Sequence, residues 1–117
     1  MTRIIEIRSY NLKAGTRATF ERIANQTVRP MLELHGMDVV AASASLADET
    51  TFYLIRAYRD AADRETSQAT FYGGAAWRDG PRDSILACIE SYATIVLSAE
   101  ETTIDGLRDC LPAKRKE

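Results

Sequence analysis

The sequence predicts an α+β domain in which helices cover an antiparallel sheet of four strands. Two observations support this prediction. Segments whose side chains alternate with a period of two, as in strands, are separated by segments whose apolar residues recur every three or four positions, as in helices. The segments follow one another in the order βαββαβ, which is the split βαβ arrangement of a ferredoxin-like domain. With 117 residues, the chain has room for a single core.

The first strand and the first helix are expected within residues 4–36. Residues 4–10 alternate between aliphatic side chains and charged or aromatic ones, which is typical of a strand with two unlike faces. Apolar residues at helical spacing predict a helix over 16–36. Pro30 lies inside this helix and removes a backbone amide, so we expect the helix to kink or divide into two packed segments near 27–29.

Three more strands and two more helices complete the pattern. Residues 37–45, rich in alanine and serine, predict the second strand, and the aromatic and β-branched residues of 51–58 predict the third. A second helix is expected from Asp60 to about Thr70, and a third helix should begin at Gly80-Pro81 and carry Ile85, Leu86, Cys88 and Ile89. The last strand is expected over 92–97.

We divide the chain into a domain over residues 1–99 and a C-terminal tail or arm over residues 100–117. Ile104 and Leu107 are the apolar residues of this tail before its charged end. We expect them to dock on a partner subunit as a short helix or arm.

Composition disfavours several classes of function. The 15 basic residues nearly balance the 17 acidic ones, so the chain offers no broad positive surface for nucleic acid. No apolar stretch approaches the length of about 20 residues that a membrane span needs, and no export signal is seen, so we expect a cytoplasmic protein. One histidine with two separated cysteines, Cys88 and Cys110, predicts free thiols and no metal site. No phosphate-binding loop or other cofactor motif is present, and no cofactor is predicted.

The two faces of the sheet differ, and this difference predicts a homodimer. The aliphatic face is expected to meet the helices and carries Ile5, Ile7, Ile55, Ile95 and Leu97. The opposite face is too apolar for a bare surface and carries Arg8, Tyr10, Leu54, Arg56, Tyr58, Tyr92 and Val96. A second copy of the chain would cover it and close two sheets into a barrel, with Arg8 and Arg56 pairing with Glu6 and Glu90 across an interface. The alternative is a solvated amphipathic surface.

Four segments of the chain resemble the NIPSNAP family. Residues 5–15 resemble the opening strand and turn of the family, and 32–36 resemble the end of its first helix. Residues 56–64 resemble its third strand with the helix that follows, and Trp77 matches a tryptophan after that helix. The resemblance covers roughly residues 3–98.

The resemblance implies a dimeric α+β barrel related in architecture to small cofactor-free monooxygenases, in a family with no single agreed reaction. Two local departures bear on the shape of any shared pocket. This chain has Ala75-Ala76 where many members have Asp-Pro, and Gly80-Pro81-Arg82 forms a distinct turn.

The candidate catalytic residues are His35 and Tyr53. His35 is the only histidine and therefore the only side chain with an ordinary pKa near neutrality. The structural alternative is that His35, in the last turn of a helix, caps a carbonyl group or interacts with the helix dipole.

The candidate ligand-binding residues surround Gly73-Gly74 and Gly80 and are Tyr72, Trp77, Arg78 and Arg82. Aromatic rings offer flat apolar walls and arginine offers a bidentate anchor, which suits an aromatic or carboxylated ligand. The alternative is that Trp77 fills the end of the core and both arginines are solvated.

Two functions are therefore open. The first is a small enzyme without a cofactor that acts on a small aromatic or carboxylated molecule, with His35 or Tyr53 moving a proton. The second is a small-molecule-binding or regulatory module without turnover. Convergence of His35, Tyr53 and Trp77 on one cavity would favour the enzyme.

Overall fold

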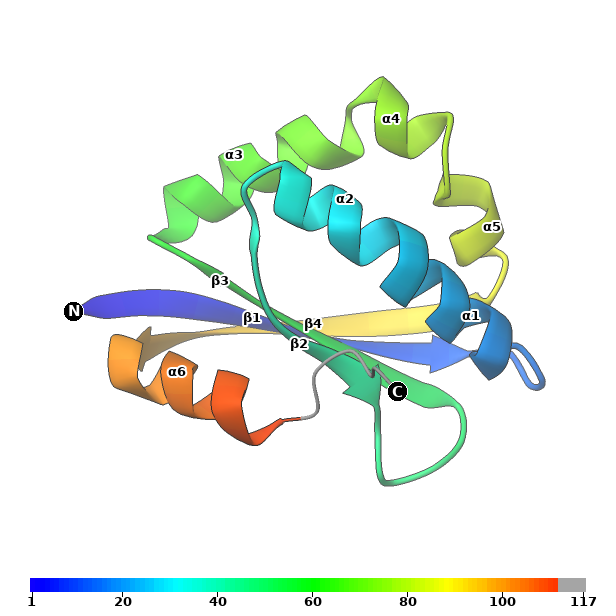
Figure 1. Cartoon of the computed structure of the whole chain (residues 1–117), viewed down its shortest axis with the longest axis horizontal. Coiled ribbons are helices and arrows are strands. Elements are labelled where there is room, and N and C mark those ends of the chain that lie inside the picture. The colour runs from blue at the N-terminus through cyan, green and yellow to red at the C-terminus, as the bar shows by residue number, and fades with distance from the viewer. Residues whose placement is uncertain (112–117) are drawn as a thin grey trace.

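The computed structural model describes residues 1–111 as one antiparallel sheet with helices on both of its faces (Figure 1). The elements are β1 (Thr2–Leu12), α1 (Arg17–Ile23), a π-helix (Ala24–Val28), α2 (Arg29–Leu34), β2 (Asp38–Ala44), β3 (Thr51–Tyr58), α3 (Ala61–Tyr72), α4 (Ala75–Arg78), α5 (Arg82–Leu86), β4 (Ile89–Glu100) and α6 (Glu101–Cys110). The strands pair in the order β2-β3-β1-β4, and each pair is antiparallel. This confirms the predicted ferredoxin-like α+β fold with its four-stranded sheet.

The first helical region shows how the chain accommodates Pro30. The proline lies in the first turn of α2, and the turn before it is the π-helix Ala24–Val28. Proline cannot donate an amide hydrogen bond and its ring crowds the preceding turn, so a wider turn relieves both problems. The break therefore occurs near the predicted place, but α1 and α2 continue along one line (Figure 1) instead of forming two packed segments.

The segment between α3 and β4 differs from the sequence prediction. The sequence predicts a single helix here, which begins at Gly80-Pro81, whereas the structure has the short helix α4 before this point and the short helix α5 after it. Ile85 and Leu86 belong to α5, but the helix ends there, and Ile89 already begins β4. The expectation that this helix carries Cys88 and Ile89 is wrong. Strand β4 is correspondingly longer than predicted and extends from Ile89 to Glu100.

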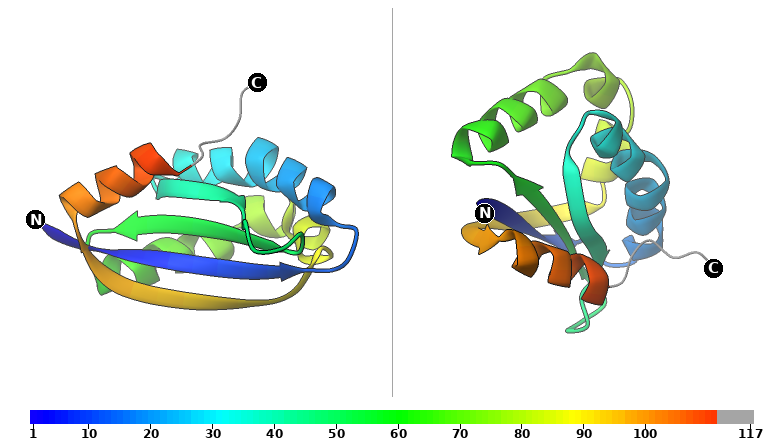
Figure 2. Two further views of the ribbon diagram at one scale, coloured as in Figure 1. Left: turned by 90° about the horizontal axis from the view of Figure 1, so that it is seen from below. Right: turned by 60° about the vertical axis from the view of Figure 1, so that its left-hand side comes forward.

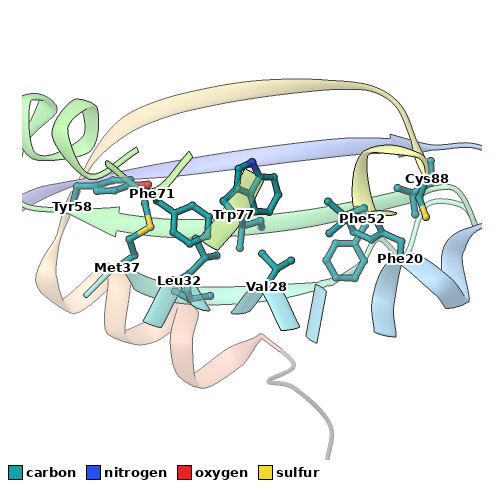
Figure 3. Packing of buried hydrophobic residues seen from close by; sticks show 14 residues of the cluster. Phe20, Val28, Leu32, Met37, Phe52, Tyr58, Phe71, Trp77 and Cys88 are labelled. Atoms are coloured by element: carbon teal, nitrogen blue, oxygen red, sulfur yellow. The ribbon is translucent and has the colours of Figure 1, made fainter. Parts of the chain in front are cut away.

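Each face of the sheet has its own apolar cluster. The larger cluster lies between the sheet and the helices α1 to α5 and includes Phe20, Leu32, Phe52 and Phe71 (Figure 3). The smaller cluster lies under α6 and consists of Ile5, Val40, Ile55, Ala57, Ala99 and Ile104. Figure 2 shows α3 and α6 on opposite sides of the sheet.

The assignment of the two faces from the sequence is wrong. Leu54 and Tyr58, expected on the partner-facing side, belong to the cluster that meets α1 to α5. Ile5 and Ile55, expected to meet those helices, lie under α6 instead. The reason is electrostatic: charged side chains are buried only when they are paired, and those on this face pair with one another within the chain.

The C-terminal segment forms the helix α6, which packs on the sheet of its own chain. Ile104 is fully buried there, so the expected docking of this residue on a partner subunit is not what the structure shows. Asp38 ties the helix to the sheet, because its carboxylate binds Arg108 of α6 at 2.9 Å and Arg3 of β1 at 3.1 Å. Residues 112–117 of the tail lie outside the described residues. Within residues 1–111, no helix is long and apolar enough to cross a membrane.

Candidate functional site

A cavity of about 340 Å³ lies between the sheet and the helices on its larger core. Its apolar wall comes from the π-helix, β3, β4 and the helices α4 and α5, through Val28, Leu54, Trp77, Ile85, Leu86 and Ile89. Its polar wall comes from β1, α3 and β4, through Arg8, Tyr10, Gln68, Tyr72 and Tyr92. A mainly apolar hollow with a few convergent polar groups is typical of a small-molecule site.

Aromatic rings line this cavity in two groups. Tyr72 and Trp77 meet edge to face, with ring centroids 5.1 Å apart, and Phe71 packs behind both at 4.9 and 5.6 Å. Figure 3 shows Trp77 and Phe71 together in the layer between sheet and helices. Tyr10 lies 6.0 Å from Tyr92 on the neighbouring strand. These rings present flat apolar surfaces to an occupant of the cavity.

A glycine turn brings Tyr72 and Trp77 to the same wall. Gly73 ends α3, and α4 begins two residues later. A Cβ atom at position 73 would lie 2.7 Å from the carbonyl oxygen of Ala69, which is closer than side chains tolerate. The sharp turn between α3 and α4 therefore requires glycine at this position.

Beside the cavity, Glu6 holds a buried cluster of arginines. Its carboxylate accepts hydrogen bonds from Arg56 Nε at 2.9 Å, Arg64 Nη2 at 2.9 Å, Gln68 Nε2 at 2.8 Å and Arg8 Nη2 at 3.1 Å. Glu6 and Arg56 are both fully buried. Their positions face each other in the register of β1 and β3, so the strand pairing itself brings the charges together.

The environment of Glu6 keeps its carboxyl group ionised. Burial on its own would raise the pKa, but the charge of Arg56, the hydrogen bonds from Gln68 and Arg64 and the charge of Arg8 together lower the pKa to about 2. A carboxylate with so low a pKa is a weak base at neutral pH. Glu6 therefore positions the arginines and is a poor candidate for proton transfer.

Tyr10 contributes a neutral hydroxyl group to the cavity wall. Burial, reinforced by the neighbouring Tyr72, raises the pKa of Tyr10 to about 12. The phenol is therefore protonated at neutral pH and is available as a hydrogen-bond donor.

Arg8 is held in place on three sides. Its Nε donates to Thr94 Oγ1 at 3.3 Å, its Nη2 donates to Glu6, and its guanidinium lies 4.9 Å from the centre of the Tyr92 ring. Contrary to the expected pairing across an interface, Arg8 and Arg56 both bind Glu6 of the same chain.

The structure brings two of the four predicted ligand-binding residues to the cavity. Tyr72 and Trp77 line it. Trp77 also belongs to the larger apolar cluster, in agreement with the alternative that this residue fills part of the core. Arg78 and Arg82 are exposed and lie outside the cavity wall, and Arg82 pairs with its neighbour Asp83 at 2.9 Å.

The two predicted catalytic residues lie apart from the cavity wall and from each other. His35 is exposed at the end of α2, where its Nδ1 lies 2.9 Å from the carbonyl oxygen of Met31 and its ring meets Phe71 edge to face. Tyr53 packs against the smaller cluster, under α6. His35, Tyr53 and Trp77 therefore do not converge on one cavity, and catalytic roles for the first two stay predictions.

Sequence reasoning missed the buried charge cluster as part of the site. Glu6, Arg64 and Gln68 were not among the candidate residues, and Arg8 and Arg56 were assigned mainly to an interface. One signal in the sequence could have revealed the cluster. Glu6 on the first strand and Arg56 on the third carry opposite charges, and they face each other when these two strands pair in the sheet. Within residues 1–111, no group of three or more His, Cys, Asp or Glu side chains could hold a metal ion.

Comparison with known structures shows the same fold in several bacterial proteins. A NIPSNAP-like domain protein from Burkholderia xenovorans is 15% identical, with a TM-score of 0.76, over 85% of this chain and 86% of that chain. A NIPSNAP family protein from Agrobacterium tumefaciens is 19% identical, with a TM-score of 0.76, over 83% of this chain and 87% of that chain.

A more distant neighbour comes from Nitrosomonas europaea and bears the name "Putative antibiotic biosynthesis monooxygenase". It is 19% identical, with a TM-score of 0.58, over 80% of this chain and 95% of that chain. No curated protein sequence matches the chain.

The sequence model of the NIPSNAP family matches residues 5–99. This range includes every residue that lines the cavity and the Glu6 cluster beside it. It also includes residues 5–15, 32–36 and 56–64 and Trp77, which resemble the family in sequence. The chain therefore belongs to the NIPSNAP family.

Proposed function

We propose that the protein binds a small aromatic or carboxylated molecule in the cavity between the sheet and helices α3 to α5. The observation that carries this proposal is the cavity wall itself, where Tyr72, Trp77 and Tyr92 surround a hollow of about 340 Å³ that Arg8 also lines. Cavities of this size and composition hold small ligands in many proteins.

The polar groups of the cavity favour binding over acid-base chemistry by the protein. Its lining residues in the described chain include no histidine, cysteine or carboxylate, and the one nearby carboxylate, Glu6, is bound by arginines. Tyr10 and Tyr72 instead offer hydroxyl groups, which orient a ligand by hydrogen bonding.

A cofactor-independent enzyme is the second candidate function. It is favoured by the name of the Nitrosomonas europaea neighbour, "Putative antibiotic biosynthesis monooxygenase", and by a cavity in which aromatic walls would orient an oxidisable molecule. Oxygen uptake in the presence of each bound compound tests this candidate. Uptake together with a new product supports an enzyme, whereas binding without product leaves a binding module.

The binding proposal is tested by thermal unfolding with 3-phenylpropanoate and its uncharged amide, 3-phenylpropanamide, each with one aromatic ring. A ligand at about 100 times its Kd stabilises the native state by about 2.7 kcal/mol, which raises the unfolding midpoint by several degrees. At least one compound should do so with the wild-type protein.

Two matched variants locate the binding. Leu86 lines the cavity and is partly exposed, so Leu86→Trp should fill the cavity and remove the stabilisation. Leu34→Trp places the same side chain on the exposed end of α2 and should leave it intact. Stabilisation that survives Leu86→Trp, or that neither compound produces, would contradict a site in this cavity.

The same proposal includes a homodimer, formed through the exposed strand β4. This strand is at an edge of the sheet, and Ile95 and Leu97, on the face that carries α6, are 59% and 42% exposed. Val96, on the other face, is 43% exposed. A long edge strand with apolar side chains on both faces favours association, and a second copy of the chain covers it by two-fold symmetry.

A further inference from the structure

The charges beside the cavity do not balance. Arg8, Arg56 and Arg64 all pair with the single carboxylate of Glu6, which gives three positive charges against one negative charge. In the described residues, none of the three arginines has another ion pair. Because an uncompensated charge is costly where water is excluded, this cluster favours the arrival of a further negative group.

Arg8 connects the cluster to the cavity. It is the only charged side chain among the residues that line the cavity wall within the described chain. Arg56, by contrast, is fully buried and directs its Nη1 to the hydroxyl oxygen of Tyr72 at 2.9 Å. An anion that enters the cavity therefore meets Arg8 first.

The hydrogen bonds of Arg8 leave donors free. Its Nε is bound to Thr94 and one N–H of Nη2 to Glu6, and the hydroxyl group of Tyr10 is a further side-chain partner of the guanidinium. A guanidinium has five N–H groups, so these contacts leave others for a ligand. The side chain is held by these bonds and by the Tyr92 ring, so its remaining N–H groups have a fixed direction. A guanidinium held in this way is pre-organised to bind a carboxylate through two parallel hydrogen bonds.

We infer that the ligand of the cavity is a carboxylate, whose anionic group binds Arg8 while its apolar body lies against the rings of Tyr72 and Trp77. This inference rests on the proposed function and names the chemistry of its ligand. Tyr72 supports the same assignment: its hydroxyl oxygen accepts from Arg56, which leaves its own proton for an acceptor in the cavity. Gln68 lines the same side but donates from Nε2 to Glu6 and to Tyr58, so it positions the cluster.

A carboxylate fits this site better than a phosphate group does. A carboxylate is planar and singly charged, and one guanidinium edge matches it. A phosphate monoester is tetrahedral and presents three terminal oxygens, whereas Arg8 is the one charged side chain that the described cavity wall offers to bind them.

The experiment compares the affinities of 3-phenylpropanoate and 3-phenylpropanamide by isothermal titration of the wild-type protein. The carboxylate should bind about tenfold or more tightly than the amide, because only the anion forms a charge-assisted pair with Arg8. Phenethyl phosphate, with a similar ring and linker, should bind more weakly than the carboxylate.

Three variants assign the preference to Arg8. Arg8→Met should reduce the ratio of the two affinities to about one, and Arg8→Lys should keep a reduced preference because it retains the charge but loses the planar pair of donors. Arg59→Met removes an exposed arginine near the start of α3 and should leave the ratio unchanged. If Arg8→Met fails to fold, the wild-type comparison and Arg8→Lys still decide the question.

The outcomes separate this inference from the proposed function. If the amide binds as tightly as the carboxylate, the cavity is a ligand site but the anionic preference is wrong. A phosphate that binds more tightly than the carboxylate also overturns the assignment. If none of the three compounds binds, the proposed function fails and the inference fails with it.

Discussion

The side chains of Glu6 and Arg56 form an ion pair that is completely shielded from solvent. Glu6 Oε1 lies 2.8 Å from Arg56 Nη2, and both side chains have an exposed fraction of 0%. The two residues face each other on β1 and β3, at the centre of the sheet. This pair couples the stability of the fold to the electrostatics of the cavity, because Arg8 binds the same carboxylate.

Glu6→Gln should destabilise the protein strongly. The change keeps the shape of the side chain but leaves Arg8, Arg56 and Arg64 without their shared counter-charge, and breaking a buried pair in this way costs about 3–5 kcal/mol. Urea unfolding at neutral pH measures the loss. The matched control is Glu33→Gln, whose side chain is 51% exposed in its pair with Arg29, and which should cost less than about 1 kcal/mol. Equal effects of the two substitutions would contradict the role of Glu6.

Acid should weaken the fold through the same carboxyl group. The pKa of Glu6 falls from 4.5 to about 2 in the folded protein, so the folded state holds its proton less tightly than the unfolded state does. The resulting stabilisation is complete above about pH 4.5 and is lost as the pH falls toward 2, and it amounts to roughly 3 kcal/mol by linkage. Asp38, whose pKa is also lowered, contributes in the same direction.

The difference between wild type and Glu6→Gln isolates this contribution. Urea unfolding at fixed protein concentration between pH 7 and pH 3 should show a steep loss of stability in the wild type and a shallower one in the variant. Parallel curves would show that another group carries the acid sensitivity.

The sequence was sufficient to predict the topology of the sheet. The alternation of residues 4–10 and the β-branched and aromatic residues of 51–58 are local signals, and β1 and β3 form where these signals lie. The split βαβ order then leaves few arrangements of four strands. The short helix α4 was missed because Gly73-Gly74 and Gly80-Pro81 indicate breaks but not the single turn between them. The helix after Gly80-Pro81 was predicted, but α5 ends before Cys88.

The face of the sheet that meets the helices could not be predicted from local signals. Alternation separates Ile5 from Glu6 but does not state which of them lies under α3. The number of apolar residues is larger on the face of Ile5, which favours that face as the one that meets the helices. Glu6 is nevertheless buried because it pairs with Arg56, about fifty positions away in the chain. The same limit applies to the residues that line the cavity. Tyr72 and Trp77 could be predicted because they lie in a local cluster of aromatic residues. The place of Arg8 could not, because it depends on how strands far apart in the sequence pair.

Leu97→Lys should convert the proposed dimer into monomers. Leu97 is on the exposed edge strand β4, and a lysine there would bury a charge in the association of two copies. Light scattering during size exclusion should give a dimer for the wild type and a monomer for the variant. Leu46→Lys, in the exposed connection between β2 and β3, is the control and should leave the dimer intact. A monomeric wild type at micromolar concentration would overturn the dimer.

Ile104→Ala should reduce the stability of the subunit itself. The side chain is fully buried between α6 and the sheet, among Ile5, Val40 and Ile55, and its removal leaves a cavity that costs about 2–5 kcal/mol. Thr103→Ala, on the exposed side of the same helix, should have little effect on the free energy of unfolding. If both variants unfold at the urea concentration of the wild type, the docking of α6 on its own sheet is contradicted.

Trp77 should report the filling of the cavity through its own fluorescence. It is the only tryptophan of the chain, it is nearly buried, and it lines the cavity beside Tyr72. A ligand that packs against this wall excludes water and small quenchers from the indole ring, so saturating 3-phenylpropanoate should protect the emission from acrylamide. Leu34→Trp is unsuitable for this measurement because it adds a second tryptophan. The control is therefore Trp77→Phe. Its emission should not change with ligand, while thermal unfolding should still detect binding. Protection that is absent in the wild type, although the compound stabilises the fold, would place the ligand away from Trp77 and outside the cavity.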